Sequence, residues 1–166
     1  MLLLLTACAS APPPPVAKAP EWDMIPPGVT DLLCARLQMD ALATGTVSAV
    51  RITQPLVNAE SVAALRSSIS SPKAVRHPVT PQLINRAIPI LFGPRCAWKA
   101  LDVFDPRPSD EMLVELSAPI INPVIPSEAG IFVRVTLGGE HPAWYWIALV
   151  PKDDQWGARW VYVLAR

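Results

Sequence analysis

The chain has 166 residues, of which 51% are hydrophobic, and its fourteen basic residues balance fourteen acidic ones. No block of like charge is present, which argues against a nucleic-acid partner, because such proteins carry a basic stripe. It also argues against a polybasic membrane patch, which needs clustered Lys and Arg. Twenty prolines, against an average of about 5%, divide the chain into short elements and disfavour long helices or a wide parallel sheet.

The N-terminus is an apolar run that ends in Leu5-Thr6-Ala7-Cys8. This motif resembles the lipobox of bacterial lipoproteins, in which an apolar residue and two small residues precede a cysteine that is acylated. The resemblance implies that Cys8 is lipidated and that the lipid bilayer is a partner. Because the run before Cys8 is short and lacks a basic start, we expect it to be the end of a longer signal. A transmembrane helix would need about 20 apolar residues. The alternative is an apolar start whose cysteine is accidental.

Small residues and prolines fill positions 9–20. Such a tether favours an extended path of about 3 Å per residue and would span roughly 35 Å. In the lipoprotein family an aspartate after the cysteine favours inner-membrane retention, and the Ala9 present here resembles the outer-membrane class. The expected organisation is therefore a signal remnant at 1–7, a lipidated tether at 8–28, and one periplasmic domain at 29–166 in the bacterial cell envelope.

Two further cysteines, Cys34 and Cys96, are expected to form one disulfide in an oxidising compartment. Closing a loop of about 63 residues would stabilise the fold by on the order of 4 kcal/mol. The alternative is two separate buried thiols. A metal site is disfavoured, because His77 and His141 do not stand at ligand spacing from either cysteine.

Helices are expected mainly in the N-terminal half of the domain. Thr30 is predicted to cap the first helix, which runs through Ala43, and Asn58 or Ala59 opens a second one that ends near Ile69 without a full capping box. A β-branched strand is expected between them at 46–53. Thr80-Pro81 predicts a short third helix over 82–87.

Alternation of apolar and polar residues predicts strands in the C-terminal half. The expected strands are 96–104, 112–116, 131–137, 144–150 and 159–164, of which the last three form a meander. The apolar but proline-interrupted segment 119–126 suits an edge and is the best candidate for an exposed apolar surface.

The predicted fold class is α+β, with two or three short N-terminal helices packed on a curved antiparallel sheet of four to six strands that ends in a three-stranded meander. The order of elements over residues 30–166 loosely resembles the cystatin-like and nuclear-transport-factor-two-like folds. That resemblance is one of element order without a shared motif, and it implies no particular activity.

Aromatic residues gather in the last strands, where the favoured interpretation is that they pack beneath the helices. The alternative is that paired indoles on one face form a platform for a protein loop or a glycan. The candidate binding surface consists of Trp144, Trp146, Trp160 and Tyr162, with Ile120 and Ile121 from the proline-interrupted segment.

No catalytic residue, metal or cofactor is assigned. Glu140-His141 lies in a predicted turn without a nucleophile, and the loose acidic group Asp102, Asp105, Asp110 and Glu111 does not match a calcium loop. The favoured function is a non-enzymatic, membrane-anchored envelope lipoprotein whose domain binds an envelope protein or supports a complex. The alternatives are a carrier of a small apolar ligand and, less supported, a wall or glycan hydrolase.

Overall fold

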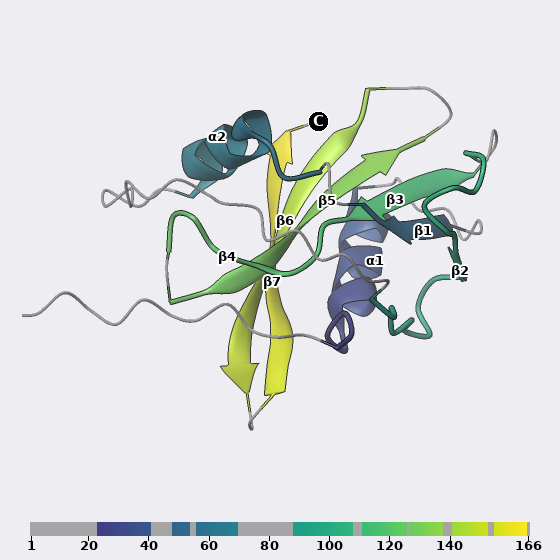
Figure 1. Cartoon of the computed structure of the whole chain (residues 1–166), viewed down its shortest axis with the longest axis horizontal. Coiled ribbons are helices and arrows are strands. Elements are labelled where there is room, and N and C mark those ends of the chain that lie inside the picture. The colour runs from purple at the N-terminus through teal and green to yellow at the C-terminus, as the bar shows by residue number, and fades with distance from the viewer. Residues whose placement is uncertain are drawn as a thin grey trace, which may run out of the picture.

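A computed structural model describes residues 23–40, 48–53, 56–69, 88–107, 111–125, 127–137, 141–152 and 155–165. These residues form two helices and seven strands (Figure 1). In chain order the elements are α1 (Val29–Met39), β1 (Ser48–Ile52), α2 (Ala59–Ser68), β2 (Trp98–Ala100), β3 (Met112–Leu116), β4 (Ile120–Ile121), β5 (Ala129–Thr136), β6 (Ala143–Lys152) and β7 (Gln155–Ala165). Neither helix is long and apolar enough to cross a membrane. The third helix expected at 82–87 lies outside the described residues.

All seven strands belong to one open sheet with the order β2-β1-β3-β5-β6-β7, and β4 also pairs with β5. Strand β1 is parallel to both of its neighbours, β2 and β3, whereas the remaining pairs are antiparallel. The predicted antiparallel sheet of four to six strands is therefore wrong, because the sheet is mixed and larger. The residue pattern of a short segment such as β1 indicates a strand. It does not indicate which distant strand pairs with it, or whether the pair is parallel or antiparallel.

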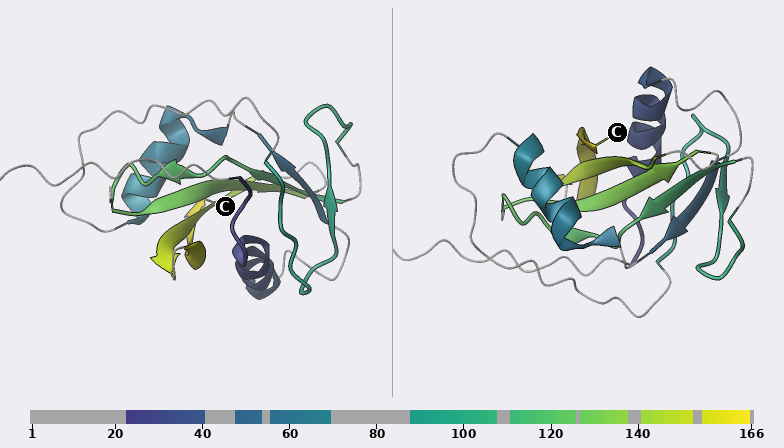
Figure 2. Two further views of the ribbon diagram at one scale, coloured as in Figure 1. Left: turned by 60° about the horizontal axis from the view of Figure 1, so that its bottom comes forward. Right: turned by 90° about the horizontal axis from the view of Figure 1, so that it is seen from above.

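The two helices lie on opposite faces of this sheet (Figure 2). Residues at odd positions of β5 and β6 point to the α1 side, and even positions point to the α2 side. The α1 cluster includes Leu33, Leu37, Val114, Ile131, Val133, Tyr145 and Ile147. The α2 cluster is smaller and includes Val62, Leu65, Ile69, Ile120, Val124, Phe132, Trp146 and Ala148. The fold therefore has two apolar cores separated by the sheet.

Helix α1 begins two residues earlier than expected. Gly28, with φ of 82°, takes the N-cap position in the left-handed region, and Thr30 lies inside the helix. The Thr30 hydroxyl donates to the carbonyl of Leu91 at 2.7 Å and accepts from the Gly93 N–H at 3.1 Å. In addition, Cys34 and Cys96 form a disulfide with Cα atoms 6.0 Å apart. Helix α1 is thus fastened to the segment that precedes β2.

Helix α2 has the full capping box that the sequence analysis did not expect. The Asn58 side chain accepts from the Ser61 N–H at 2.8 Å, and the Ser61 hydroxyl accepts from the Asn58 N–H at 3.1 Å. Serine at this position fulfils the role that Glu or Gln has in the usual motif. The reciprocal bonds satisfy donors that would otherwise be unpaired at the start of the helix.

The described part of the proline-interrupted segment, 119–125, is buried or half-buried, contrary to the expectation of an exposed apolar surface. Ile120 and Ile121 form β4, which pairs with Gly130 and Ala129 of β5. The Asn122 side chain accepts from the N–H groups of Val124 and Ile125, at 2.8 and 3.2 Å. This turn folds the segment back onto the sheet, so its apolar side chains join the α2 cluster instead of facing water.

Candidate functional site

The predicted aromatic surface divides into a buried part and an exposed part. Trp146 is fully buried against the edge of the Phe132 ring, with ring centroids 4.7 Å apart, and Ile120 is buried beside it. Gly130 makes room for this indole, because a Cβ atom there would lie 2.1 Å from the Trp146 ring. Trp146 and Ile120 therefore build the α2 cluster and do not belong to a binding surface.

Trp144 and Trp160 reach solvent, but they are separated along the strand pair. Trp160 is 47% exposed and lies opposite Ala148 of β6, four residues from Trp144. At about 3.4 Å per residue this spacing separates the two backbone positions by roughly 14 Å along the strands. Each ring lies near an arginine, Arg159 at 4.7 Å from Trp160 and Arg134 at 5.7 Å from Trp144. The two exposed indoles are thus separate aromatic positions.

Tyr162 occupies the position between them and is half-buried, as is Ile121. Partial burial, followed by the charge of Glu128, raises the pKa of the Tyr162 phenol, while the Arg159 guanidinium opposes this rise. The phenol is consequently neutral over the physiological range. It can offer an O–H donor at the margin of the α2 cluster.

A charged row crosses the same face of the sheet beyond α2. Arg134 Nε donates to the buried carboxylate of Glu115 at 2.6 Å, and Glu115 lies opposite Arg51 in the β1–β3 register. Arg51 is turned toward a neighbouring loop, where its guanidinium donates to the carbonyls of Val103 and Asp105 at 3.4 and 2.9 Å. The charged groups of Arg134, Glu115 and Arg51 therefore all interact with other groups of the protein.

The turn 101–107, which follows β2, carries the most exposed large apolar side chain of the described residues. Phe104 is 94% exposed and Val103 is 55% exposed. The turn is held by the two Arg51 bonds, and its Asp102 N–H donates to the Asp105 carboxylate at 2.7 Å. An apolar side chain presented to water by an ordered turn is a feature of interaction surfaces.

This turn was not expected, because the residue pattern over 96–104 predicts a strand. The structure ends β2 at Ala100, and the Asp105 N–H then donates to the carbonyl of Asp102 at 3.2 Å. The spacing of Asp102 and Asp105 was the available signal, since aspartate side chains commonly close tight turns. Asp102 and Asp105 of the acidic group thus close a turn, whereas Glu111 directly precedes β3 and Asp110 lies outside the described residues.

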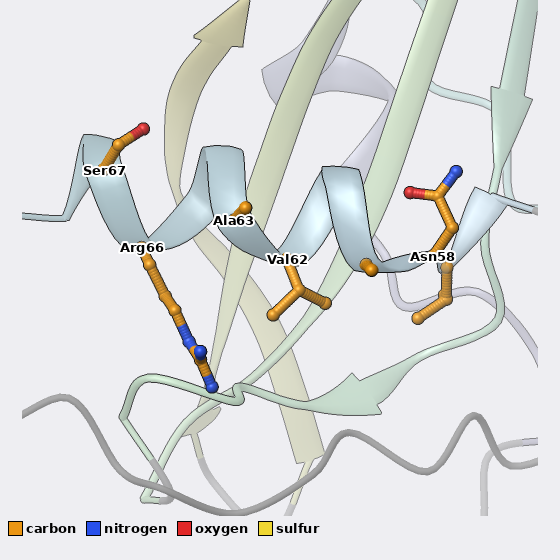
Figure 3. Close-up of a pocket in the computed structure, with 7 residues that line it drawn as sticks. Asn58, Val62, Ala63, Arg66 and Ser67 are labelled. Atoms are coloured by element: carbon orange, nitrogen blue, oxygen red, sulfur yellow. The ribbon is translucent and has the colours of Figure 1, made fainter.

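An open groove of about 730 Å³ lies beside α2 (Figure 3). The described residues that line it come from α2 and the segment before it, and they are Val57, Asn58, Ala59, Val62, Ala63, Arg66 and Ser67. Val62 and Arg66 point to the same side of the helix in Figure 3. The groove combines apolar walls with one guanidinium.

Within the described ranges, no three His, Cys, Asp or Glu side chains gather as a metal site would require. His141 is exposed, and its neighbour Glu140 lies outside the described residues, as does Cys8.

No protein-family model, no curated protein and no solved structure matches this chain. The resemblance of Leu5-Thr6-Ala7-Cys8 to a lipobox and the resemblance of the element order to the cystatin-like and nuclear-transport-factor-two-like folds therefore stay predictions.

Proposed function

We propose that this chain is a bacterial envelope lipoprotein, acylated at Cys8 and attached to the outer membrane, whose domain faces the periplasm and binds another protein without catalysing a reaction. The lipobox-like motif Leu5-Thr6-Ala7-Cys8 and the proline-rich tether after it support the anchor. A Cys34–Cys96 disulfide fits an oxidising compartment. The tether would hold the domain away from the lipid surface, where a partner can reach it.

The exposed Phe104 ring is the observation that carries the binding part of the proposal. Four hydrogen bonds hold its turn, two from Arg51 and two between Asp102 and Asp105. A preformed turn loses little conformational entropy on binding. Burial of one aromatic side chain in a partner's pocket can therefore contribute strongly to affinity. The flanking Asp102 and Asp105 are exposed, which favours a pocket with a basic rim over insertion into a bilayer.

The anchor is tested by changing Cys8→Ser in the full chain and separating membrane from soluble envelope fractions. The expected result is a shift of the protein to the soluble fraction, because a single substitution removes the acylated side chain. If the variant stays with the membrane at the original level, the lipidation proposal fails.

The binding surface is tested by placing a photoactivatable phenylalanine analogue at position 104 of the anchored protein in cells. The control carries the same analogue at Met39, which is 79% exposed at the end of α1. One discrete cross-linked species at position 104, absent at position 39 and lost when Arg51→Ala loosens the turn, would support the proposal. Equal cross-linking at both positions, or none at position 104, would refute this surface.

The groove beside α2 favours one second function, the carrier of a small apolar ligand. Its described lining is mostly apolar. Native mass spectrometry of the purified full chain would show an added mass if a ligand is carried. Substitution Ala63→Trp, on the groove wall, should then remove that mass, and a bare chain would argue against the carrier.

A further inference from the structure

The two ends of the sheet are protected to different degrees. Strand β2, at one end, has three residues, and its Lys99 side chain is exposed. Short length and lysine are common means by which edge strands avoid pairing with another chain. Strand β7, at the other end, has eleven residues and contains no proline and no lysine. Within the described part of the chain, β7 pairs with β6 on one side and no strand pairs with its other side.

Strand β7 is also packed on both faces and nearly uncharged. Helices α1 and α2 both pack on it, one on each face. Its only charged residue is Arg159. Register shifts against β6 lie between Ala158 and Trp160 and between Val163 and Ala165, and they leave two regular stretches, Gln155–Ala158 and Trp160–Val163. The second stretch consists of aromatic and β-branched residues, which favour pairing with another strand.

We propose that β7 pairs antiparallel with β7 of a second copy of this chain, about a two-fold axis at Val161. In this register Trp160 lies opposite Tyr162 of the second copy on the α2 face, and Val161 lies opposite its own equivalent on the α1 face. Arg159 lies opposite Val163, so no like charges are opposed. Aromatic pairs directly across an antiparallel ladder stabilise it.

Charge favours a second copy over another extended peptide. A strand with one charge in eleven residues offers almost no counter-charge to an acidic or basic segment. The same strand presents to itself an equally neutral, apolar edge, and a two-fold axis makes each favourable pair occur twice. The result would be one continuous sheet through both copies. This inference does not depend on the anchor or on the Phe104 surface.

The first test is the mass in solution of the full chain carrying Cys8→Ser, which removes the thiol outside the Cys34–Cys96 pair. Light scattering and sedimentation should give about twice the 18.0 kDa of one chain in the micromolar range. Trp160→Lys should weaken the dimer about tenfold or more, since it removes two aromatic pairs and buries a charge. Leu91→Lys, at a site of similar exposure on the segment before β2, should leave the dimer unchanged.

The register is tested with two matched cysteine variants in the same background. Directly opposed residues have Cα atoms about 4.5–5.5 Å apart, which suits a disulfide. Oxidation should therefore link two chains of Val161→Cys, whereas Val163→Cys on the same face of the same strand should link poorly. A monomeric mass at all concentrations, a dimer that Trp160→Lys leaves intact, or linking at position 163 equal to that at 161 would each overturn the proposal.

Discussion

The face of the sheet beneath α1 is a large apolar cluster, whereas the face beneath α2 combines a smaller cluster with an ion pair and partly exposed aromatic rings. A disulfide fastens α1, and no such bond fastens α2 within the described residues. The comparison suggests a division of roles. The α1 side supplies most of the stability, whereas the α2 side carries the partly exposed rings of Trp144 and Trp160 and the groove.

Removal of the disulfide should have the largest effect on stability. The double variant Cys34→Ser with Cys96→Ser releases a cross-link between residues 62 apart in sequence. The chain-entropy model predicts a loss of about 4 kcal/mol in the free energy of unfolding. Urea denaturation of the full chain would measure it, with Cys8→Ser as the control that should change nothing. A loss below about 1 kcal/mol would show that the α1 side does not depend on this bond.

A matched pair of leucines tests the two clusters directly. Leu33 of α1 and Leu65 of α2 are both fully buried, and Leu→Ala in a core costs about 2–5 kcal/mol. We expect the larger loss at Leu33, because the disulfide at the adjacent Cys34 prevents α1 from moving to fill the cavity. Helix α2 can shift toward the sheet more freely.

Leu33→Ala and Leu65→Ala can also be compared in the double cysteine variant, which lacks the disulfide. In that variant the two losses in the free energy of unfolding should become similar, which a double-mutant cycle would show. If Leu33→Ala stays costlier by the same amount, packing alone and not the covalent bond explains the difference.

The ion pair on the α2 side should contribute less. Glu115 is 9% exposed and Arg134 is 38% exposed. Arg134→Met leaves a buried carboxylate without its main partner and should cost about 2–3 kcal/mol, below the value for fully buried pairs because the arginine is partly solvated. Glu115→Gln keeps an acceptor for the guanidinium and should cost about 1 kcal/mol. Thermal or urea unfolding would measure both, and the reverse order would mean that the Glu115 carboxylate is stabilised by other groups.

Local patterns predicted the strands better than their arrangement. Alternation indicated strands at 131–137, 144–150 and 159–164, and the structure has β5, β6 and β7 there, each longer by one or more residues. The parallel partners of β1 could not be predicted, because pairing across sixty residues depends on packing that no local pattern records. The mixed sheet follows from that single strand.

The candidate site shows the same limit. An indole at position 146 and one at position 160 give the same signal in sequence, and only the position of α2 buries the first while leaving the second exposed. The exposure of Phe104 was not predicted either, because the apolar residues from Cys96 onward indicate a strand. The turn that carries Phe104 is held by the Arg51 bonds, which come from a distant part of the chain.

The smallest predicted effect concerns the titration of Tyr162. Burial and then Glu128 raise the pKa of its phenol, and Arg159 lowers it. Glu128→Gln should therefore lower this pKa, and Arg159→Gln should raise it further. Ultraviolet absorbance of the phenolate, with Tyr162→Phe as the reference, would measure both.

A pKa of Tyr162 above its unfolded value means that the folded state holds the phenol proton more tightly. The corresponding stability is fully present below the unfolded pKa and is lost as the pH rises through the folded pKa. Tyr162→Phe should accordingly unfold less readily than the unsubstituted chain at alkaline pH, and an unchanged alkaline transition would show that this phenol does not report on the packing of α2.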